Sequence, residues 1–228
     1  MSSYALQITY FGGIVVEIIL DFKFKLDKAI VINTLKSYCE FITDEEINTI
    51  YETLLPILYE SVQPVGVFTM EKKSDDFTFN VIKDCNYIFY CIITMGDKCT
   101  EEVNKLFSYG KMKEAMILDA MATSYLFEIS SQLFNHIYNY ASELGMGLSC
   151  RIAPGDGEIP LWYQKNILDK LDAKNFLGIY MIDDCMLSSL RSMAYIYGAD
   201  KQQEASRKDH DCSKCSNRTY CSMKKIHN

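Results

Sequence analysis

The sequence lacks any apolar run of about 18 residues, the length that a helix needs to cross a bilayer. The stretch GIVVEIIL is short and carries Glu17. The first residues, MSSYALQITYFGG, also lack the basic and then apolar layout of a secretion signal. We therefore expect a cytoplasmic protein without a membrane segment.

An excess of positive charge is also missing, since 23 lysines and arginines face 30 aspartates and glutamates and the net charge is −7. Domains that bind nucleic acids usually present a basic face, so this balance argues against a general nucleic-acid-binding protein. The chain contains no Walker loop and no G-x-G-x-x-G, G-x-S-x-G or H-E-x-x-H motif. The common nucleotide-binding, serine-hydrolase and zinc-protease signatures are therefore absent.

Several segments have the pattern of β-strands. The positions from Val16 to Leu26 alternate between apolar and mostly charged residues, which is the period of a half-buried strand. Other segments are rich in the aromatic and β-branched residues that strands favour. We expect these further strands at 65–73, 77–83, 86–96, 148–152, 177–182 and 191–198.

Helices are predicted between and after the early strands. Residues TDEE at 43–46 form a capping box that opens a helix to about residue 60, with Pro56 marking a kink or an early end. A short helix is expected over 100–109, and an apolar stripe at helical spacing predicts a long helix over about 111–144. With 228 residues, the chain can bury one substantial core. This mixture predicts an α+β domain with a largely antiparallel sheet.

The segment RIAPGDGEIPLWYQKNIL, residues 151–168, contains the first candidate binding residues. Arg151 follows a strand candidate and precedes a turn at Pro154 and Gly155. A guanidinium held at that point can bind a carboxylate through two parallel hydrogen bonds. A surface salt bridge to Asp156 or Glu158 is the alternative, and composition alone does not decide between the two.

Two further residues are candidates for ligand contact. Glu128 borders the apolar stripe of the long helix, a turn from Tyr125 and Gln132, where it can meet a cationic group or remain a solvated acid. Tyr195 and Tyr197 alternate on a strand candidate and share one face. That arrangement suits stacking on a base, but core packing is the default interpretation.

The composition changes after residue 198, where a polar linker leads to the cysteine spacing C-x2-C-x5-C. Nine cysteines without a secretion signal favour reduced thiols or metal ligands over disulfides. A pair spaced C-x2-C can direct two thiolates at one metal, so we expect zinc or an iron–sulfur cluster here rather than three exposed thiols. The expected ligands are Cys212, Cys215 and Cys221, with Cys185, His210 or His227 as the fourth.

Three segments, taken in order, resemble the activation (reactivation) domain family of cobalamin-dependent methionine synthase. Residues 93–129 are similar to that family's T-x-G, helix and L-D-A run, and residues 151–168 are similar to its R-x-x-P-G-Y-G-x-x-P-L-x-x-Q segment. Residues 183–198 resemble its cysteine–methionine, P-x-K-S-x-S and glycine stretch. The cysteine triplet resembles the tail of stand-alone bacterial members. The resemblance covers roughly residues 85–225.

The resemblance implies a twisted antiparallel sheet with surrounding helices. Residues 1–84 are then the N-terminal α/β portion of the same domain, and residues 85–198 form its activation-domain-like core. Residues 199–228 form the polar linker and the metal-binding tail.

The resemblance also implies a function. Members bind S-adenosylmethionine in a shallow groove and regenerate methylcobalamin, using an electron from a flavodoxin-type or ferredoxin-type donor. Arg151 would hold the cofactor's carboxylate, and the turn at Pro154 and Gly155 would offer backbone groups. Asp156 replaces the family's tyrosine, and Ser189 and Arg191 replace its proline and lysine.

Cobalamin is expected only on a partner, because the D-x-H-x-x-G element of many corrinoid proteins is missing from the sequence. The partner would be a corrinoid protein or methionine synthase modules supplied in trans. A second hypothesis is a non-enzymatic adaptor of corrinoid methyl transfer that keeps the docking fold, has lost the cofactor and uses a metal-ordered tail for contact.

Overall fold

The computed structural model describes residues 6–11, 14–37, 39, 41–203 and 209. Within this part of the chain, six strands form one sheet in the order β1-β2-β3-β4-β6-β5, and every neighbouring pair is antiparallel. The last long strand therefore inserts beside β4, near the middle of the sheet. The strands are β1 Leu6–Phe11, β2 Ile14–Ile19, β3 Val65–Lys72, β4 Tyr87–Thr94, β5 Gly147–Leu148 and β6 Ser192–Asp200.

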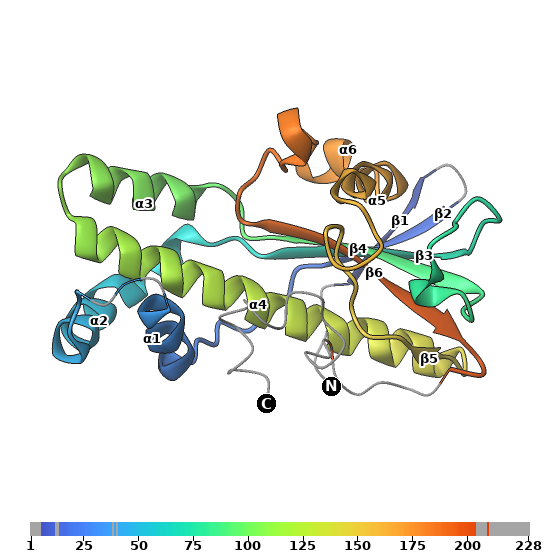
Figure 1. The fold of residues 1–228 in the computed structure, drawn as a ribbon, viewed down its shortest axis with the longest axis horizontal. Coiled ribbons are helices and arrows are strands. Elements are labelled where there is room, and N and C mark those ends of the chain that lie inside the picture. The colour runs from blue at the N-terminus through green and yellow to red at the C-terminus, as the bar shows by residue number, and fades with distance from the viewer. Residues whose placement is uncertain (1–5, 12–13, 38, 40, 204–208, 210–228) are drawn as a thin grey trace.

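Helices cover both faces of this sheet, as Figure 1 shows. The 32-residue helix α4 runs along one face, and α1, α2 and α3 pack against it, whereas α5 and α6 lie on the opposite face. None of the helices in the described residues combines the length and the apolarity needed to span a membrane. The helices are α1 Lys28–Lys36, α2 Asp44–Ser61, α3 Lys98–Ser108, α4 Met112–Glu143, α5 Gln164–Lys170 and α6 Ala173–Leu177.

The central strand β4 shows why the sheet needs both layers. Phe89 and Cys91 belong to the core on the α4 face, and Ile88 and Ile92 belong to the core on the α5 face. All four side chains are 0% exposed, so apolar residues occupy successive positions of the strand. The predicted α+β class with a mostly antiparallel sheet and flanking helices is confirmed.

Four of the predicted strands are wrong in whole or in part. Of residues 148–152, only Leu148 lies in a strand, β5, and Ile152 forms an isolated bridge to Ile196. The strand expected from Val16 ends at Ile19, and residues 77–83 contain a short 3₁₀-helix, Asn80–Ile82, instead of a strand. Phe77 and Phe79 there pack edge to face with Tyr163, so their alternation serves an aromatic cluster. Residues 177–182 form only a single bridge, since Gly178, at φ 69°, caps α6 just before it.

The capping box of α2 is confirmed. The Thr43 hydroxyl accepts from the Glu46 amide at 3.3 Å, and the Glu46 carboxylate accepts from the Thr43 amide at 3.0 Å. Glu46 also accepts from Lys113 of α4 at 2.5 Å, and this bond and those to Thr43 lower the pKa of Glu46 to about 2. The helix then continues through Pro56 to Ser61.

Replacing Thr43 with alanine removes the acceptor for a helix-terminal amide, so we expect Thr43→Ala to lower the free energy of unfolding by about 1 kcal/mol. Urea denaturation followed by circular dichroism measures the change. Thr53→Ala is the matched control, because Thr53 is exposed on the same helix and its hydroxyl donates to the Ile50 carbonyl three residues earlier. Equal losses in the two variants would contradict a capping role.

Candidate functional site at Arg151

The segment that carries Arg151 lies along the edge of β6. The Ser149 amide donates to the Gly198 carbonyl at 2.8 Å, and Ile152 and Ile196 exchange two backbone hydrogen bonds at 3.0 and 2.9 Å. Because side chains alternate along an extended segment, Ile152 joins the core on the α5 face and Arg151 points to the α4 face.

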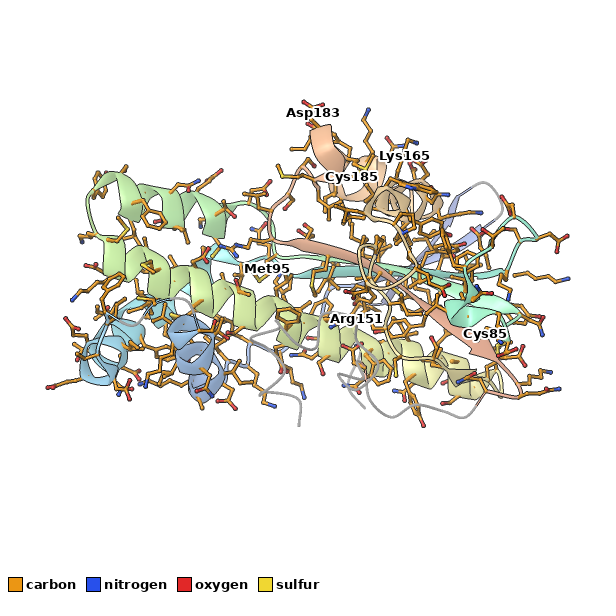
Figure 2. The ribbon with its side chains drawn as sticks, in the orientation of Figure 1. Cys85, Met95, Arg151, Lys165, Asp183 and Cys185 are labelled. Atoms are coloured by element: carbon orange, nitrogen blue, oxygen red, sulfur yellow. The ribbon has the colours of Figure 1, made fainter. Side chains whose placement is uncertain are left out.

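The guanidinium of Arg151 is held between β6 and α4 (Figure 2). It lies 5.4 Å from the ring centroid of Tyr195 on β6 and 5.9 Å from that of Phe127 on α4. Its Nη1 donates to the Ser130 hydroxyl at 2.5 Å, and that hydroxyl donates to the Tyr195 hydroxyl at 3.2 Å. The Arg151 side chain is only 10% exposed, so rigid elements fix the orientation of the cation.

The Arg151 guanidinium is already paired with a carboxylate. Oδ2 of Asp209 lies 2.9 Å from Nη1 of Arg151, and the Tyr197 hydroxyl donates to Oδ1 of the same carboxylate. The backbone amide of Arg151 donates to the Asp209 carbonyl at 2.7 Å. The predicted salt-bridge partners were Asp156 and Glu158, but the ion pair is formed with Asp209.

The electrostatics favour a bound anion. Burial lowers the pKa of Arg151, but the negative charge of Asp209 and further contributions from Tyr197, Tyr195 and Asp156 outweigh burial, so the pKa rises above its ordinary value. Burial raises the pKa of Tyr195 and Tyr197 well above the ordinary value, and the charge of Asp209 adds to this. Tyr197 therefore remains a hydrogen-bond donor, and the site presents a guanidinium, a hydroxyl and a backbone amide to one acidic residue.

The predicted turn after Arg151 is confirmed. The Asp156 amide donates to the Ala153 carbonyl at 2.9 Å, and the Gly155 amide donates to the Ile159 carbonyl at 2.8 Å. Gly155 has φ 93°, a conformation that favours glycine. The turn forms as expected, but these two amides are engaged within it. Pro154 and Asp156 are half-buried, and Gly155 is exposed.

Glu128 lies on α4 next to Phe127 and is half-buried. Its carboxylate accepts from Gln132 at 3.0 Å, and the same Gln132 amide exchanges two hydrogen bonds of 2.9 Å with the backbone of Lys23. Burial and the charge of Glu128 raise the pKa of Tyr125 to about 12. The structure thus places Glu128 within one turn of Ser130, beside the chain segment that follows β2.

Core packing, the default interpretation of the two tyrosines, is confirmed: Tyr195 is 1% exposed and Tyr197 is 0% exposed, both on the α4 face. The Tyr195 ring packs against the guanidinium of Arg151 and is not exposed for stacking on a ligand. Ser130, Phe127 and Asp209 were not among the predicted site residues. Phe127 and Ser130 are three residues apart on one helix, a spacing that marks a shared face. Asp209 lies in the polar linker, where no pattern signalled its contact.

Arg191, in the third of the segments that carry the resemblance, makes a second contact with α4. Its guanidinium is paired with Asp119 of the L-D-A run and donates to the Thr123 hydroxyl at 3.1 Å. Among the described residues, its Nε and the hydroxyl of Ser189 are buried without a hydrogen-bond partner. The three segments on which the resemblance rests therefore meet at α4.

The predicted metal ligands are only partly within the structure. Cys212, Cys215 and Cys221 lie outside the described residues, and within those residues no group of three or more histidine, cysteine or acidic side chains is arranged to hold a metal. Cys185 lies on the α5 side of the sheet, where its carbonyl accepts from Gln164 at 2.8 Å. Figure 2 shows it well separated from Arg151. The metal site stays a prediction.

No family model and no curated protein sequence matches the chain. Among solved structures, the chain is similar to the crystal structure of the MetH reactivation domain bound to AdoHcy, with a TM-score of 0.60 and 10% sequence identity. The match covers 84% of this chain and 80% of that chain. At this identity the likeness shows a shared fold, and it agrees with the fold that the sequence resemblance implied.

The raised pKa values of Tyr195 and Tyr197 predict a loss of stability in alkali. Above about pH 10 the unfolded chain releases protons that these buried phenols retain, so their contribution is complete below that pH and falls as the pH rises. We expect Tyr197→Phe to reduce the alkaline fall in the free energy of unfolding by up to about 1.4 kcal/mol per pH unit. Urea denaturation at several pH values measures it. Tyr109→Phe, at an exposed ring, is the control, and an identical slope in both variants would refute the assignment.

Proposed function

We propose that this protein binds S-adenosylmethionine or S-adenosylhomocysteine at the Arg151 site and supports the reductive methylation of a corrinoid held by a separate protein. The observation that supports the proposal most strongly is the carboxylate receptor formed by the Arg151 guanidinium and the Tyr197 hydroxyl, here filled by the carboxylate of Asp209. The similar fold of a reactivation domain bound to AdoHcy indicates which ligand to test first.

The receptor matches one end of such a ligand. Both molecules carry an amino-acid carboxylate, for which a guanidinium and a tyrosine hydroxyl are suitable donors. The position of the Asp209 carboxylate, paired with Arg151 and accepting from Tyr197, supports the same place for this group. Asp156, which contributes to the field at Arg151, and Glu128 on α4 supply negative charge for the ammonium and sulfonium groups.

The chain's residues would bind and orient the ligand, and its partners would supply the reacting centre. S-adenosylmethionine would supply the methyl group. The cobalt would come from a corrinoid protein or from methionine synthase modules, and the electron from a flavodoxin or a ferredoxin. Arg151 would fix the amino-acid end of the ligand, and the turn at Pro154 and Gly155 would border it.

The adaptor hypothesis also has an observation in its favour. Asp209 satisfies Arg151 without a ligand, and Asp156 stands where the family has a tyrosine. In an adaptor, the ion pair would only attach the segment after β6 to the domain.

Isothermal titration calorimetry with S-adenosylhomocysteine tests the ligand. We expect Arg151→Gln to weaken binding about 10- to 100-fold, since it removes charge-assisted hydrogen bonds to the carboxylate. Lys165→Gln is the charge-matched control, because Lys165 forms an exposed pair with Asp169 on α5. Equal affinity of the Arg151→Gln variant and the wild-type protein would rule out this receptor, and no binding by any form would favour the adaptor.

Metal analysis after anaerobic purification tests the tail. We expect about one zinc ion or one iron–sulfur cluster per chain, lost on Cys212→Ser because thiolates are the ligands. Visible absorption distinguishes a cluster from colourless zinc. Cys185→Ser tests the fourth ligand, and full metal content in that variant would exclude Cys185. Retention of metal by a variant lacking all three tail cysteines would refute the site.

A further inference from the structure

We propose that Asp209 is an intramolecular competitor for the Arg151 receptor, so that a carboxylate ligand binds only when Asp209 leaves it. The identity of the competing ligand rests on the function proposed above. The contact itself consists of residues that the structure describes: the paired carboxylate and guanidinium, the Tyr197 hydroxyl and the Arg151 amide.

Asp209 is held as a ligand would be held. Each of its two carboxylate oxygens has its own donor, Arg151 for Oδ2 and Tyr197 for Oδ1. Its carbonyl accepts from the Arg151 amide, and its side chain is 15% exposed. An exposed ion pair between flexible side chains rarely has this many converging donors, and such a pair contributes little to stability. The arrangement around Asp209 is that of a built receptor.

Two carboxylates cannot share this receptor. Tyr197 has a single hydroxyl proton, which it donates to Asp209, and Nη1 of Arg151 is divided between Asp209 and Ser130. A second carboxylate brought into the same buried volume would face the first without an additional cation. Two negative charges in contact in a region of low polarity repel each other strongly. Occupation by Asp209 and by an external ligand is therefore mutually exclusive.

The competitor and its receptor are close together in the sequence. Asp209 is 12 residues from Tyr197, whose hydroxyl donates to it. A competitor joined to its receptor by so few residues has an effective concentration on the order of millimolar. If Asp209 fills the receptor for about nine-tenths of the time, the apparent affinity for an external carboxylate falls about tenfold.

The coupling is reciprocal by thermodynamic necessity. Ligand binding at Arg151 would release Asp209, and any event that draws Asp209 away would raise the affinity for the ligand. Asp209 stands three positions before Cys212, the first cysteine of the predicted metal site. The residue that would leave the receptor on ligand binding is therefore close in the sequence to the predicted metal ligands.

The test compares wild-type protein with Asp209→Asn, which keeps the shape of the side chain and removes its charge. Calorimetric titration with S-adenosylhomocysteine is expected to show at least about tenfold tighter binding by the variant. Titration with the same nucleoside lacking the amino-acid carboxylate should show no such gain. Asp169→Asn, the same substitution in the exposed ion pair with Lys165, is the control and should bind as the wild type does.

Hydrogen–deuterium exchange gives a readout that needs no ligand. The Arg151 amide donates to the backbone carbonyl of residue 209, which the substitution keeps. Because loss of the side-chain ion pair should let residue 209 leave the receptor more often, the peptide containing Arg151 should exchange faster in Asp209→Asn than in the wild type. Saturating S-adenosylhomocysteine should speed exchange in wild-type peptides that contain Asp209. A thermal melt monitors folding of each variant, and Asp209→Ala provides a second removal of the carboxylate.

The outcomes separate the two proposals. Equal affinity of wild type and Asp209→Asn for S-adenosylhomocysteine would overturn the competition and leave the proposed function standing. Absence of binding by either protein would overturn both. Unchanged exchange at Arg151 in the ligand-free variant would show that the Asp209 carboxylate does not keep this residue at the receptor, and this outcome does not depend on the choice of ligand. Tighter binding that depends on the ligand's carboxylate, together with faster exchange, would support the competition.

Discussion

The buried guanidinium of Arg151 determines how the segment beside β6 is arranged. The Arg151 side chain is 10% exposed, and a buried guanidinium is costly unless acceptors surround it. The rings of Tyr195 and Phe127 offset part of this cost, and the Ser130 hydroxyl offsets more. Balance of the charge still requires an anion. The site therefore has a standing requirement for a carboxylate, which Asp209 meets.

This requirement follows from the layering of the sheet. Tyr195 and Tyr197 are fixed because β6 is buried on both faces and pairs with β4 from Ser192 to Ala199. The segment bearing Arg151 is held by hydrogen bonds to β6, so the guanidinium lies against the buried ring of Tyr195. Donors held on a strand and a long helix bind a carboxylate without first being ordered, which lowers the entropy lost on binding.

The sequence was informative where local physics decides the outcome. The Thr43 capping box and the apolar stripe of α4 depend on neighbours within a turn, and both were predicted. The turn after Arg151 was also predicted, because proline and glycine act locally. The segment 77–83 failed as a strand, since its aromatic residues pack on Tyr163, more than 80 residues away. Such distant packing leaves no periodic trace.

The carboxylate of the site shows the same limit. Arg151 was recognised as needing an anion, but the anion was sought nearby, at Asp156 or Glu158. The actual partner, Asp209, is 58 residues away in a polar segment where one acid resembles another. Only the fold brings it to Arg151. Asp156 contributes to the field at Arg151 instead of forming the main pair.

The spacing of polar residues on α4 explains how the three segments of the resemblance are joined. Asp119, Thr123, Phe127 and Ser130 follow one another at intervals of four, four and three residues, so they share one face of the helix. Arg191, just before β6, contacts the first two, and Arg151, beside the middle of β6, contacts the last two.

These contacts fit the dimensions of the two elements that they join. The 11 residue steps from Asp119 to Ser130 span about 16 Å of helix, and the four residue steps from Arg191 to Tyr195 span about 14 Å of strand. The two arginines thus set the register of α4 against β6 at two points along the strand. A fold can persist at 10% identity because core residues are interchangeable by size. A charged contact that sets register is less interchangeable, since it requires a particular donor opposite a particular acceptor, and Arg151 combines that structural role with the carboxylate receptor.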